Sequence, residues 1–419
     1  MIARTGGMEA IHGACVLTRR PPIPEPILVE NQNQVEQFCK VCLKEKRFAF
    51  DTEFVMEDRY ESQVCLIQLA TSESVMLIDP FLGLDLRPIA ELIAGKRTET
   101  VVHAGQEDLV FSVQQVGKPP RNVFDTQLAA GFVGYDYPLS LQRLVQSTQH
   151  VRLHKAKTLT DWRRRPLSPA QIRYGAEDVS YLLQVSDVLK SRSAELGRSE
   201  WVSAELKRFE DISLYQRAEE DKIARLKGVG ALNGQQLAVV RELLGWREEF
   251  AKRVNRPVRA ALKDHLLVEI AKHSMVEFAE VSSLRGLNLG HRDIHTLCRV
   301  VEQALALSSD KWPVPKPHEL GKPHEAPLVA LATAVIRGYC MENDLAYGLV
   351  ATQRSITELV RHLSERKKKG RDQGVEILQG WRGEAVGALL QDVLSGTRAV
   401  CVDQSGGEPI IRALPARSE

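Results

Sequence analysis

The stretch FAFDTEFV, residues 48–55, places two acidic residues inside an otherwise apolar segment that is typical of a buried β-strand. Side chains alternate between the faces of a strand, so Ala49, Asp51 and Glu53 share one face. Two carboxylates on one face repel each other unless a cation joins them, and hard oxygen ligands favour Mg²⁺ or Mn²⁺ over zinc. The alternative is a strand end that enters solvent with two exposed acids. The Asp-x-Glu pair alone does not decide between the two.

Further short, β-rich runs surround this strand between residues 47 and 103, namely VCLIQLAT, VMLIDP and TVVH. From about residue 105 the apolar residues recur at helical spacing, and beyond residue 205 strand patterns nearly vanish. Strands followed by helices predict an α/β domain with a mixed sheet. The predicted organisation is a flexible N-terminal tail (1–25), the α/β domain (26–205), a small all-helical domain (206–308), a proline-rich linker (309–327), a second small helical domain (328–403) and a flexible C-terminal tail (404–419).

The composition is that of an ordinary soluble protein, with 419 residues, 43% hydrophobic residues and a net charge of +2. No apolar run has the length of a membrane span, and the N-terminus lacks the apolar core of a signal peptide. Seven scattered cysteines without such a signal indicate reduced thiols, and we expect Cys39 and Cys42 to pack inside a helix. The chain is therefore expected to be cytoplasmic, with no contact to a membrane.

A second acidic motif, VVHAGQEDLVFSV, begins as an apolar strand that ends at His103 and continues into a predicted helix containing Asp108. A strand-to-helix corner lies at the sheet edge where open α/β sheets bind ligands. Asp108 could instead be an acid favoured at a helix start by the helix dipole. His103 could contact a substrate, although a hydrogen-bonded structural histidine is the more common case.

The third motif, LSPAQIRYGAEDVSYLL, contains a well-marked helix start, because Ser168 and Gln171 have the spacing of a capping box. Tyr174 and Asp178 then lie one turn apart on one helix face. Asp178 can ligate a metal while the phenol hydrogen-bonds a nearby water. The alternative is that Asp178 faces solvent.

The order of these motifs resembles the DEDDy group of 3′-to-5′ exonucleases. The segments FDTEF, CLIQLA, HAGQEDLVF and LTDWRRRPLSPAQIRYGAEDVSYLL are similar to ribonuclease D over about residues 26–205. The resemblance implies a ribonuclease H-like fold and a 3′-to-5′ exoribonuclease that releases 5′-mononucleotides and trims the 3′ ends of tRNA precursors. It also implies two divalent metal ions, Mg²⁺ or Mn²⁺, held by Asp51, Glu53, Asp108 and Asp178, with Tyr174 orienting the attacking water.

A basic segment precedes the third motif and is expected to neutralise phosphates near the catalytic helix. The alternative is a solvated basic loop in which Trp162 anchors the loop and does not stack on a base. The candidate RNA contacts are Lys155, Lys157, Trp162, Arg163, Arg164 and Arg165.

One segment departs from the family. After Glu53, ribonuclease D usually carries basic residues and a Tyr-Pro pair, whereas residues 56–62 here include three acids. We expect this side of the protein to bind the substrate more weakly, or to bind a different RNA.

The helical modules also carry a resemblance. LLGWREEFAKRVNRPVRAALKDHLLVEIAKHSM is similar to the HRDC domain, a nucleic-acid-binding module. The last module resembles the second HRDC-like domain of ribonuclease D more loosely. The expected partner is RNA with a free 3′ end, and no obligate protein partner is inferred. Two alternatives stay open: a catalytically silent RNA-binding protein and a DNA exonuclease, since nothing in the sequence reads a 2′-hydroxyl directly.

Overall fold

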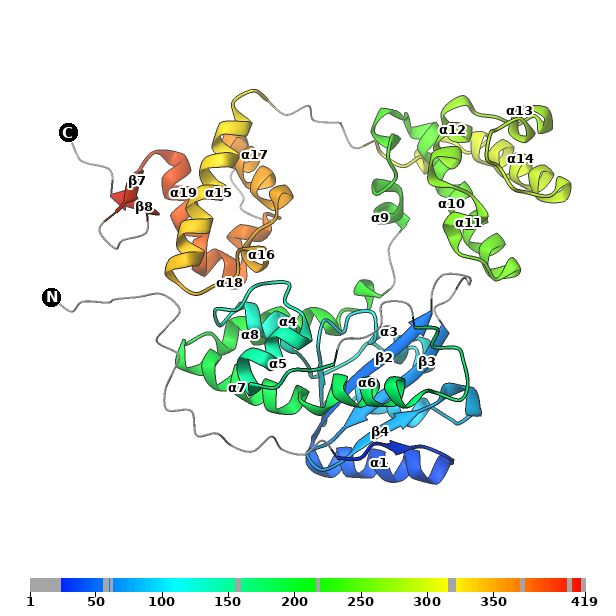
Figure 1. The fold of residues 1–419 in the computed structure, drawn as a ribbon. Helices are drawn as coiled ribbons and strands as arrows, with labels where there is room; N and C mark the ends of the chain where they lie inside the picture. Colours follow the sequence, from blue (N-terminus) through cyan, green and yellow to red (C-terminus); the bar gives the residue numbers. More distant parts are fainter. Residues whose placement is uncertain are drawn as a thin grey trace.

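The computed structural model describes residues 24–55, 60, 63–154, 160–215, 219–315, 322–369, 374–404 and 409–415. An α/β domain forms one end of the molecule, and two helical modules lie side by side at the other end (Figure 1). Most of the predicted N-terminal tail and the centre of the proline-rich linker fall outside these residues. Within the described part of the chain, no helix is both long enough and apolar enough to cross a membrane.

The α/β domain is built on a six-stranded sheet with the order β1-β4-β3-β2-β5-β6. Strand β3 runs antiparallel to β2 and β4, while the pairs β1/β4, β2/β5 and β5/β6 are parallel, which confirms the predicted mixed sheet. The strands are β1 (Ile27–Leu28), β2 (Arg47–Val55), β3 (Gln63–Ala70), β4 (Val75–Ile78), β5 (Glu99–Val102) and β6 (Val123–Asp125).

The quoted stretch is the central strand β2, and its apolar half is fully buried at Phe48, Ala49 and Phe50. Strand β2 pairs with β5 only as far as Ala49, although its pairing with β3 continues to Val55. The β5 side of β2 is therefore open beside the two acids, and the β2/β3 register shifts between Glu53 and Phe54.

Helices cover both faces of this sheet: α1, α2 and α3 contact one another along one side, while α6 contacts β2, β3 and β4 (Figure 1). Cys39 and Cys42 are buried in α1, as expected. The helices of the domain are α1 (Gln32–Glu45), η1 (Pro80–Leu82), α2 (Arg87–Ile93), α3 (Val110–Val116), α4 (Thr126–Gly131), α5 (Leu141–Gln149), α6 (Pro169–Ser180), α7 (Leu182–Glu195), α8 (Ser199–Leu206), η2 (Lys207–Glu210) and η3 (Ile212–Leu214).

Two local predictions about these helices have different outcomes. The capping box at the start of α6 is present, because the Ser168 side chain accepts a hydrogen bond from the Gln171 backbone and the Gln171 side chain accepts from the Ser168 backbone. Asp108, in contrast, does not lie in a helix. It belongs to the turn that precedes α3, which begins two residues later at Val110.

The first helical module has a hydrophobic core of its own, separate from that of the α/β domain. Its long helix α10 packs against α12 and α14. The elements of this module are α9 (Glu219–Ala224), η4 (Val229–Ala231), α10 (Gly234–Val254), α11 (Val258–Ala261), α12 (Asp264–His273), α13 (Phe278–Ser282), α14 (His291–Leu305) and η5 (Ser309–Lys311).

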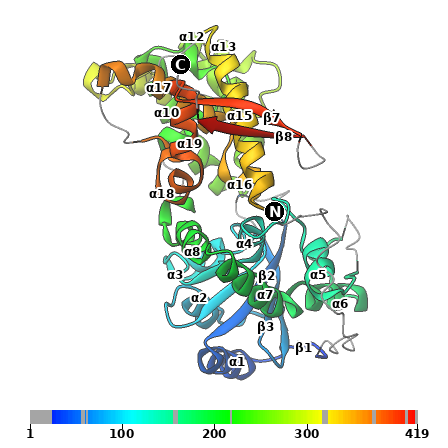
Figure 2. The same ribbon diagram turned by 90° about the vertical axis from the view of Figure 1, so that its left-hand side faces the viewer.

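The second helical module ends in a β-hairpin that packs across α15 (Figure 2). The prediction of a flexible tail over 404–419 is therefore wrong for residues 410–415, and the module is not purely helical. Ile411 and Ala413 pack against the core, and Gly338 in α15 lets the hairpin backbone approach closely. The elements are α15 (Glu325–Glu342), α16 (Tyr347–Val350), α17 (Gln353–Lys369), η6 (Glu376–Leu378), α18 (Gly380–Arg382), the π-helix η7 (Gly383–Gly387), α19 (Ala388–Ser395), β7 (Arg398–Asp403) and β8 (Ile410–Pro415).

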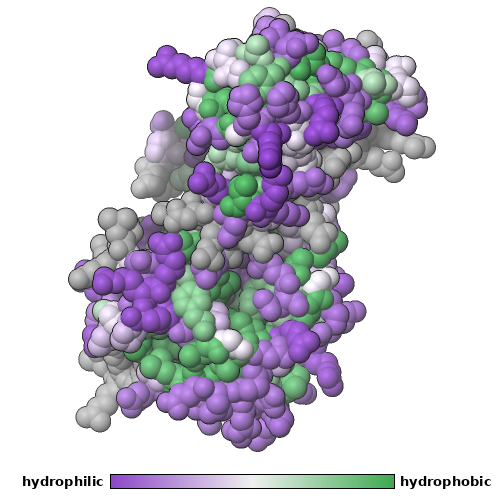
Figure 3. All heavy atoms as spheres, turned by 90° about the vertical axis from the view of Figure 1, so that its right-hand side faces the viewer, coloured by the Kyte–Doolittle hydropathy of each residue, from purple (hydrophilic) through white to green (hydrophobic). Residues whose placement is uncertain are grey.

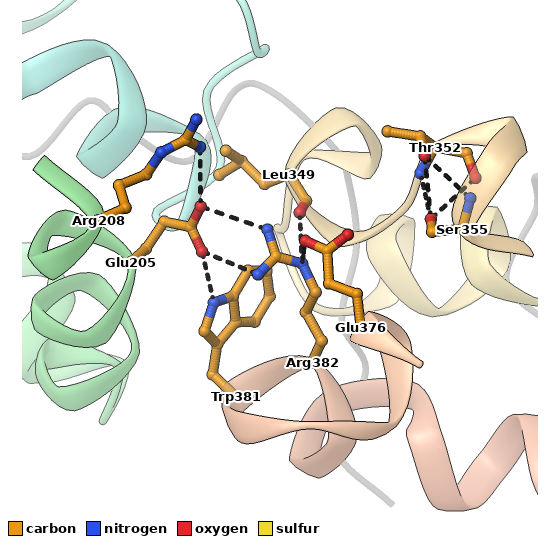
Figure 4. A network of polar contacts seen from close by, with 8 residues as sticks. All are labelled: Glu205, Arg208, Leu349, Thr352, Ser355, Glu376, Trp381 and Arg382. Atoms are coloured by element: carbon orange, nitrogen blue, oxygen red, sulfur yellow. Dashed lines mark hydrogen bonds and ion pairs between the residues drawn. The ribbon is translucent and has the colours of Figure 1, made fainter. Parts of the chain in front are cut away.

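The second helical module shares one continuous hydrophobic core with the α/β domain. A buried polar network reinforces this contact (Figure 4). The Glu205 carboxylate on α8 accepts hydrogen bonds from Trp381 Nε1 and from Arg382 Nη1, each at 2.9 Å. The phenyl ring of Phe132 packs edge-on against Trp381, with 4.7 Å between ring centroids. The two parts therefore form one packed unit.

The first helical module meets the α/β domain differently. The Tyr60 hydroxyl donates to Glu248 Oε1 over 2.7 Å, and the Lys252 ammonium lies 5.4 Å from the centre of the same ring. Seen from the side of this module, the molecule has two lobes with a narrower middle (Figure 3). The first helical module differs from the second because its hydrophobic core is separate from that of the α/β domain. The exact domain boundaries stay predictions.

Candidate active site

Four carboxylates from three separate elements face one another at the open edge of β2. Asp51 and Glu53 come from β2, Asp108 from the turn before α3, and Asp178 from α6. The charges of the other three raise the pKa of Asp51, and the charges of Asp108 and Asp178 raise the pKa of Glu53. The structure thus brings together the four acids that the sequence motifs singled out.

Burial raises the pKa of every one of these carboxyl groups, and nearby negative charges raise it further: those of other members of the cluster for Asp51, Glu53 and Asp178, and that of Asp125 for Asp108. Burial is the largest cause in all four groups. For Glu53, burial and the charges of Asp178 and Asp108 together raise the pKa to about 8. The pKa of Asp178 rises to about 7 and that of Asp108 to about 6. The pKa of Asp51 lies well above its usual value. Without a cation, the site therefore disfavours the state in which all four carboxyl groups are charged at neutral pH.

Such a cluster has the chemistry of a cation site, because a divalent ion removes the repulsion and oxygen ligands suit Mg²⁺ and Mn²⁺. In the described part of the chain, no three His, Cys, Asp or Glu side chains are already arranged to hold an ion. The donor set fits such an ion by its composition, its shared location and its raised pKa values.

Thr52 positions Asp108, and no sequence motif singled it out. The Thr52 backbone N–H donates to Asp108 Oδ1 over 3.1 Å, and its hydroxyl donates to the same oxygen. This is possible because β2 has no β5 partner beyond Ala49, so the Thr52 N–H can donate to a side-chain oxygen. The interrupted pairing is a tertiary feature that sequence periodicity does not reveal.

Tyr174 lies one turn before Asp178 on α6, close enough for its phenol and the Asp178 carboxylate to shift each other's pKa. Burial, followed by the charges of Asp178 and Glu53, raises the pKa of this phenol far above its usual value. The phenol thus stays protonated at neutral pH, which suits a group that orients water and does not remove its proton. Its ring packs 6.0 Å from that of Trp162.

A cleft of about 850 Å³ opens beside the carboxylates and is lined by Glu53 and Tyr174. A cleft of this size accommodates a small ligand. Its other walls carry Arg164 and Arg173, both exposed, together with His154. The structure therefore places the acidic cluster next to a positively charged approach.

The candidate RNA contacts are distributed unevenly around this cleft. Trp162 is only 8% exposed, which favours the anchoring role that the sequence left open. Arg165 donates to Asp79 Oδ1, to the Cys65 carbonyl and to the Trp162 carbonyl, each at 2.7 Å, so its guanidinium is occupied inside the protein.

Arg163 Nε donates to Asp161 Oδ1 over 3.1 Å. Arg164 is exposed on the cleft. Lys155 and Lys157, and the departing segment apart from Tyr60, lie outside the described residues. The contacts of these side chains with RNA stay predictions.

Two histidines near the site have different roles. His103 lies close to Thr126 Oγ1 and the Leu139 carbonyl, each at 2.9 Å, and this supports the structural alternative. Sequence reasoning missed the second, His154, whose Nδ1 lies 2.6 Å from Glu177 Oε1. The only sequence signal for this pair is that Glu177 directly precedes Asp178 on α6.

Comparison with known proteins agrees with this geometry. Residues 26–193 match the family model of a 3′-5′ exonuclease, and residues 236–293 match that of the HRDC domain. Ribonuclease D of Acidiphilium cryptum is 32% identical over 88% of this chain and 92% of its own length. Ribonuclease D of Gluconacetobacter diazotrophicus is 30% identical over 92% of this chain and 97% of its own.

Among solved structures, that of Escherichia coli RNase D, described as an exoribonuclease involved in structured RNA processing, superimposes with a TM-score of 0.76. It is 27% identical and covers 88% of this chain and 98% of its own. Exonucleases of this family depend on divalent metal ions. The likeness extends over the exonuclease domain and both helical modules. The chain therefore belongs to the ribonuclease D family and is a 3′-5′ exoribonuclease of that family.

Proposed function

We propose that this enzyme removes 5′-mononucleotides one at a time from the free 3′ end of RNA, that tRNA precursors are its substrates, and that it uses two divalent ions, Mg²⁺ or Mn²⁺. The observation that carries this proposal is the convergence of four carboxylates with raised pKa values, one of which, Glu53, lines the cleft beside them.

In this proposal Asp51, Glu53, Asp108 and Asp178 hold the ions. Bound divalent ions would neutralise the charge of the scissile phosphodiester and make an attacking water more acidic at neutral pH. Thr52 keeps the Asp108 carboxylate turned toward the cluster through its two hydrogen bonds. No covalent intermediate with the protein is required.

Tyr174 is the residue that orients the attacking water. Its phenol keeps its proton, because burial and the neighbouring carboxylates raise its pKa. It can therefore act as a fixed hydrogen-bond partner, while its contact with Trp162 limits the rotation of the ring. Arg164 and Arg173 on the cleft would hold the phosphates of the incoming strand.

The test uses the full chain with Mg²⁺ and one sequence prepared as RNA and as DNA, each labelled at its 5′ end. We expect a ladder that shortens from the 3′ end of RNA, with 5′-mononucleotides as products. A circular RNA of the same sequence is the control, because it has no 3′ end and should stay intact. Cutting of the circle would contradict the exonuclease proposal, and equal cutting of DNA would contradict the substrate.

The substrate class needs a separate experiment. A tRNA precursor with a 3′ extension, the mature tRNA and an unstructured RNA of equal length are compared at equal concentration. We expect the extension to be removed and trimming to slow near the folded acceptor stem. Equal rates of complete digestion for all three would contradict the proposed preference for tRNA precursors.

A further inference from the structure

A histidine and a buried glutamate form a pair on the wall of the cleft, apart from the four carboxylates. Glu177 lies on α6 directly before Asp178, and its side chain is 3% exposed. Its Oε1 lies 2.6 Å from His154 Nδ1, and its Oε2 accepts the His154 backbone N–H over 2.8 Å. The His154 side chain is 58% exposed and lines the cleft together with Glu53 and Tyr174. The glutamate thus holds the imidazole in one orientation.

This orientation leaves one ring atom for a ligand. A carboxylate only accepts hydrogen bonds, so Nδ1 carries the proton that joins His154 to Glu177. Within the described residues, Nε2 has no protein partner. It accepts a hydrogen bond when the ring is neutral and donates one when the ring is charged. A hydroxyl group both donates and accepts, so it can pair with Nε2 in either state.

The charge of the pair favours a hydroxyl over a phosphate. The pair of His154 and Glu177 has no net positive charge, because the carboxylate cancels the charge of the imidazole even when the ring is protonated, and Glu53 lies on the same cleft. Phosphates are better served by Arg164 and Arg173, which line this cleft, are exposed, and in the described contacts form no hydrogen bond to a carboxylate. The remaining polar groups of an RNA strand are the base edges and the ribose hydroxyls, and the 2′-hydroxyl distinguishes RNA from DNA.

We propose that His154 reads a ribose 2′-hydroxyl of the nucleotide bound next to the carboxylate cluster, and that Glu177 is the positioning residue that aims it. This inference rests on the proposed function, because it places the 3′ end of the substrate in this cleft. It supplies the direct RNA contact that the sequence motifs do not contain.

The test is a double-mutant cycle between protein and substrate. Wild-type protein and His154→Ala are each given RNA strands in which a single 2′-deoxynucleotide occupies the last, second-last or third-last position. The readout is the rate of release of the first nucleotides at limiting substrate. In wild-type protein, deoxy substitution at one position should slow cleavage about three- to tenfold, as expected for one hydrogen bond. In His154→Ala the same substitution should have no effect, while all-RNA cleavage is slowed to a similar degree.

Two control variants separate this role from general damage. His150→Asn changes an exposed histidine of the same segment, which caps α5 in a left-handed conformation that asparagine tolerates. It should keep the full deoxy effect. Glu177→Gln keeps one of the two acceptor oxygens that face His154 and should retain more of the effect than Glu177→Ala, which removes both.

Three outcomes would overturn the proposal. They are an equal deoxy effect in His154→Ala and in wild-type protein, no deoxy effect at any position in wild-type protein, and an equal loss on RNA and DNA strands, which indicates a phosphate contact. Should His154→Ala fail to fold, the wild-type deoxy series together with Glu177→Ala decides the question. A wild-type protein that cleaves no RNA would instead refute the proposed function.

Discussion

The sharpest thermodynamic prediction concerns the substitution Asp178→Asn in metal-free protein. Burial, together with the charges of Glu177 and Asp108, raises the pKa of Asp178 from 3.8 to about 7. Asparagine has nearly the same shape but carries no charge. In EDTA the variant should therefore be more stable than wild-type protein at neutral and alkaline pH, although it removes a proposed metal ligand.

The sign follows from proton linkage. The folded protein holds a proton on Asp178 at pH values where the unfolded chain has lost it, so the stability of wild-type protein falls as pH rises from about 4 to about 7. One pKa unit corresponds to about 1.4 kcal/mol, which gives an upper bound of about 4 kcal/mol above pH 7. Because neighbouring carboxylates share the repulsion, we expect a gain of about 2–4 kcal/mol at pH 8 and almost none near pH 4.

The assay is urea unfolding in EDTA, monitored by hydrogen exchange in peptides from β2 and α6. These peptides report on the unfolding of the exonuclease domain alone. Asp161→Asn is the matched control, because Asp161 is exposed and its hydrogen bond from the Arg163 backbone lowers its pKa. That variant should gain nothing. With saturating Mg²⁺ the order should reverse, since only wild-type protein retains all four carboxylates. An Asp178→Asn protein less stable than wild-type in EDTA at pH 8 would show that the charge of Asp178 does not destabilise the folded protein.

Three further predictions concern the interface and the cleft. Glu205→Ala leaves the Arg382 guanidinium and Trp381 Nε1 without their acceptor and should lower the free energy of unfolding by about 3 kcal/mol, measured by hydrogen exchange in α8. The control is Glu200→Ala on the same helix, which changes an exposed residue and should have no measurable effect. Arg164→Ala should weaken RNA binding and lower the slope of log affinity against log salt by about one, and an unchanged slope would contradict a phosphate contact. Tyr174→Phe should lower kcat at least tenfold with little change in KM, and an unchanged kcat would contradict its role with water.

Much of the fold was predictable because local patterns and tertiary structure agree there. The alternation in residues 48–55 places Asp51 and Glu53 on one face, and the capping box marks the start of α6. The spacing of Tyr174 and Asp178 is fixed by helix geometry alone. These features depend on residues close in sequence, so the sequence carries their signal directly.

The missed features depend on contacts between distant segments. Thr52 meets Asp108 only because β2 loses its β5 partner after Ala49, which no periodicity predicts. The pairing of His154 with Glu177 requires the segment after α5 to return to α6. The tail prediction failed because its glycines and charges hid the apolar residues of β8, which pack only when α15 offers a surface.

We propose that the four carboxylates form the catalytic centre of this 3′-5′ exoribonuclease. The most direct measurement compares wild-type protein and Asp178→Asn on one 5′-labelled RNA with Mg²⁺, scoring cleavage and binding in parallel. The prediction is a 3′-shortening ladder with wild-type protein, and a loss of at least a thousandfold in cleavage with nearly unchanged RNA binding in the variant. A variant that cleaves at a near wild-type rate would contradict the account.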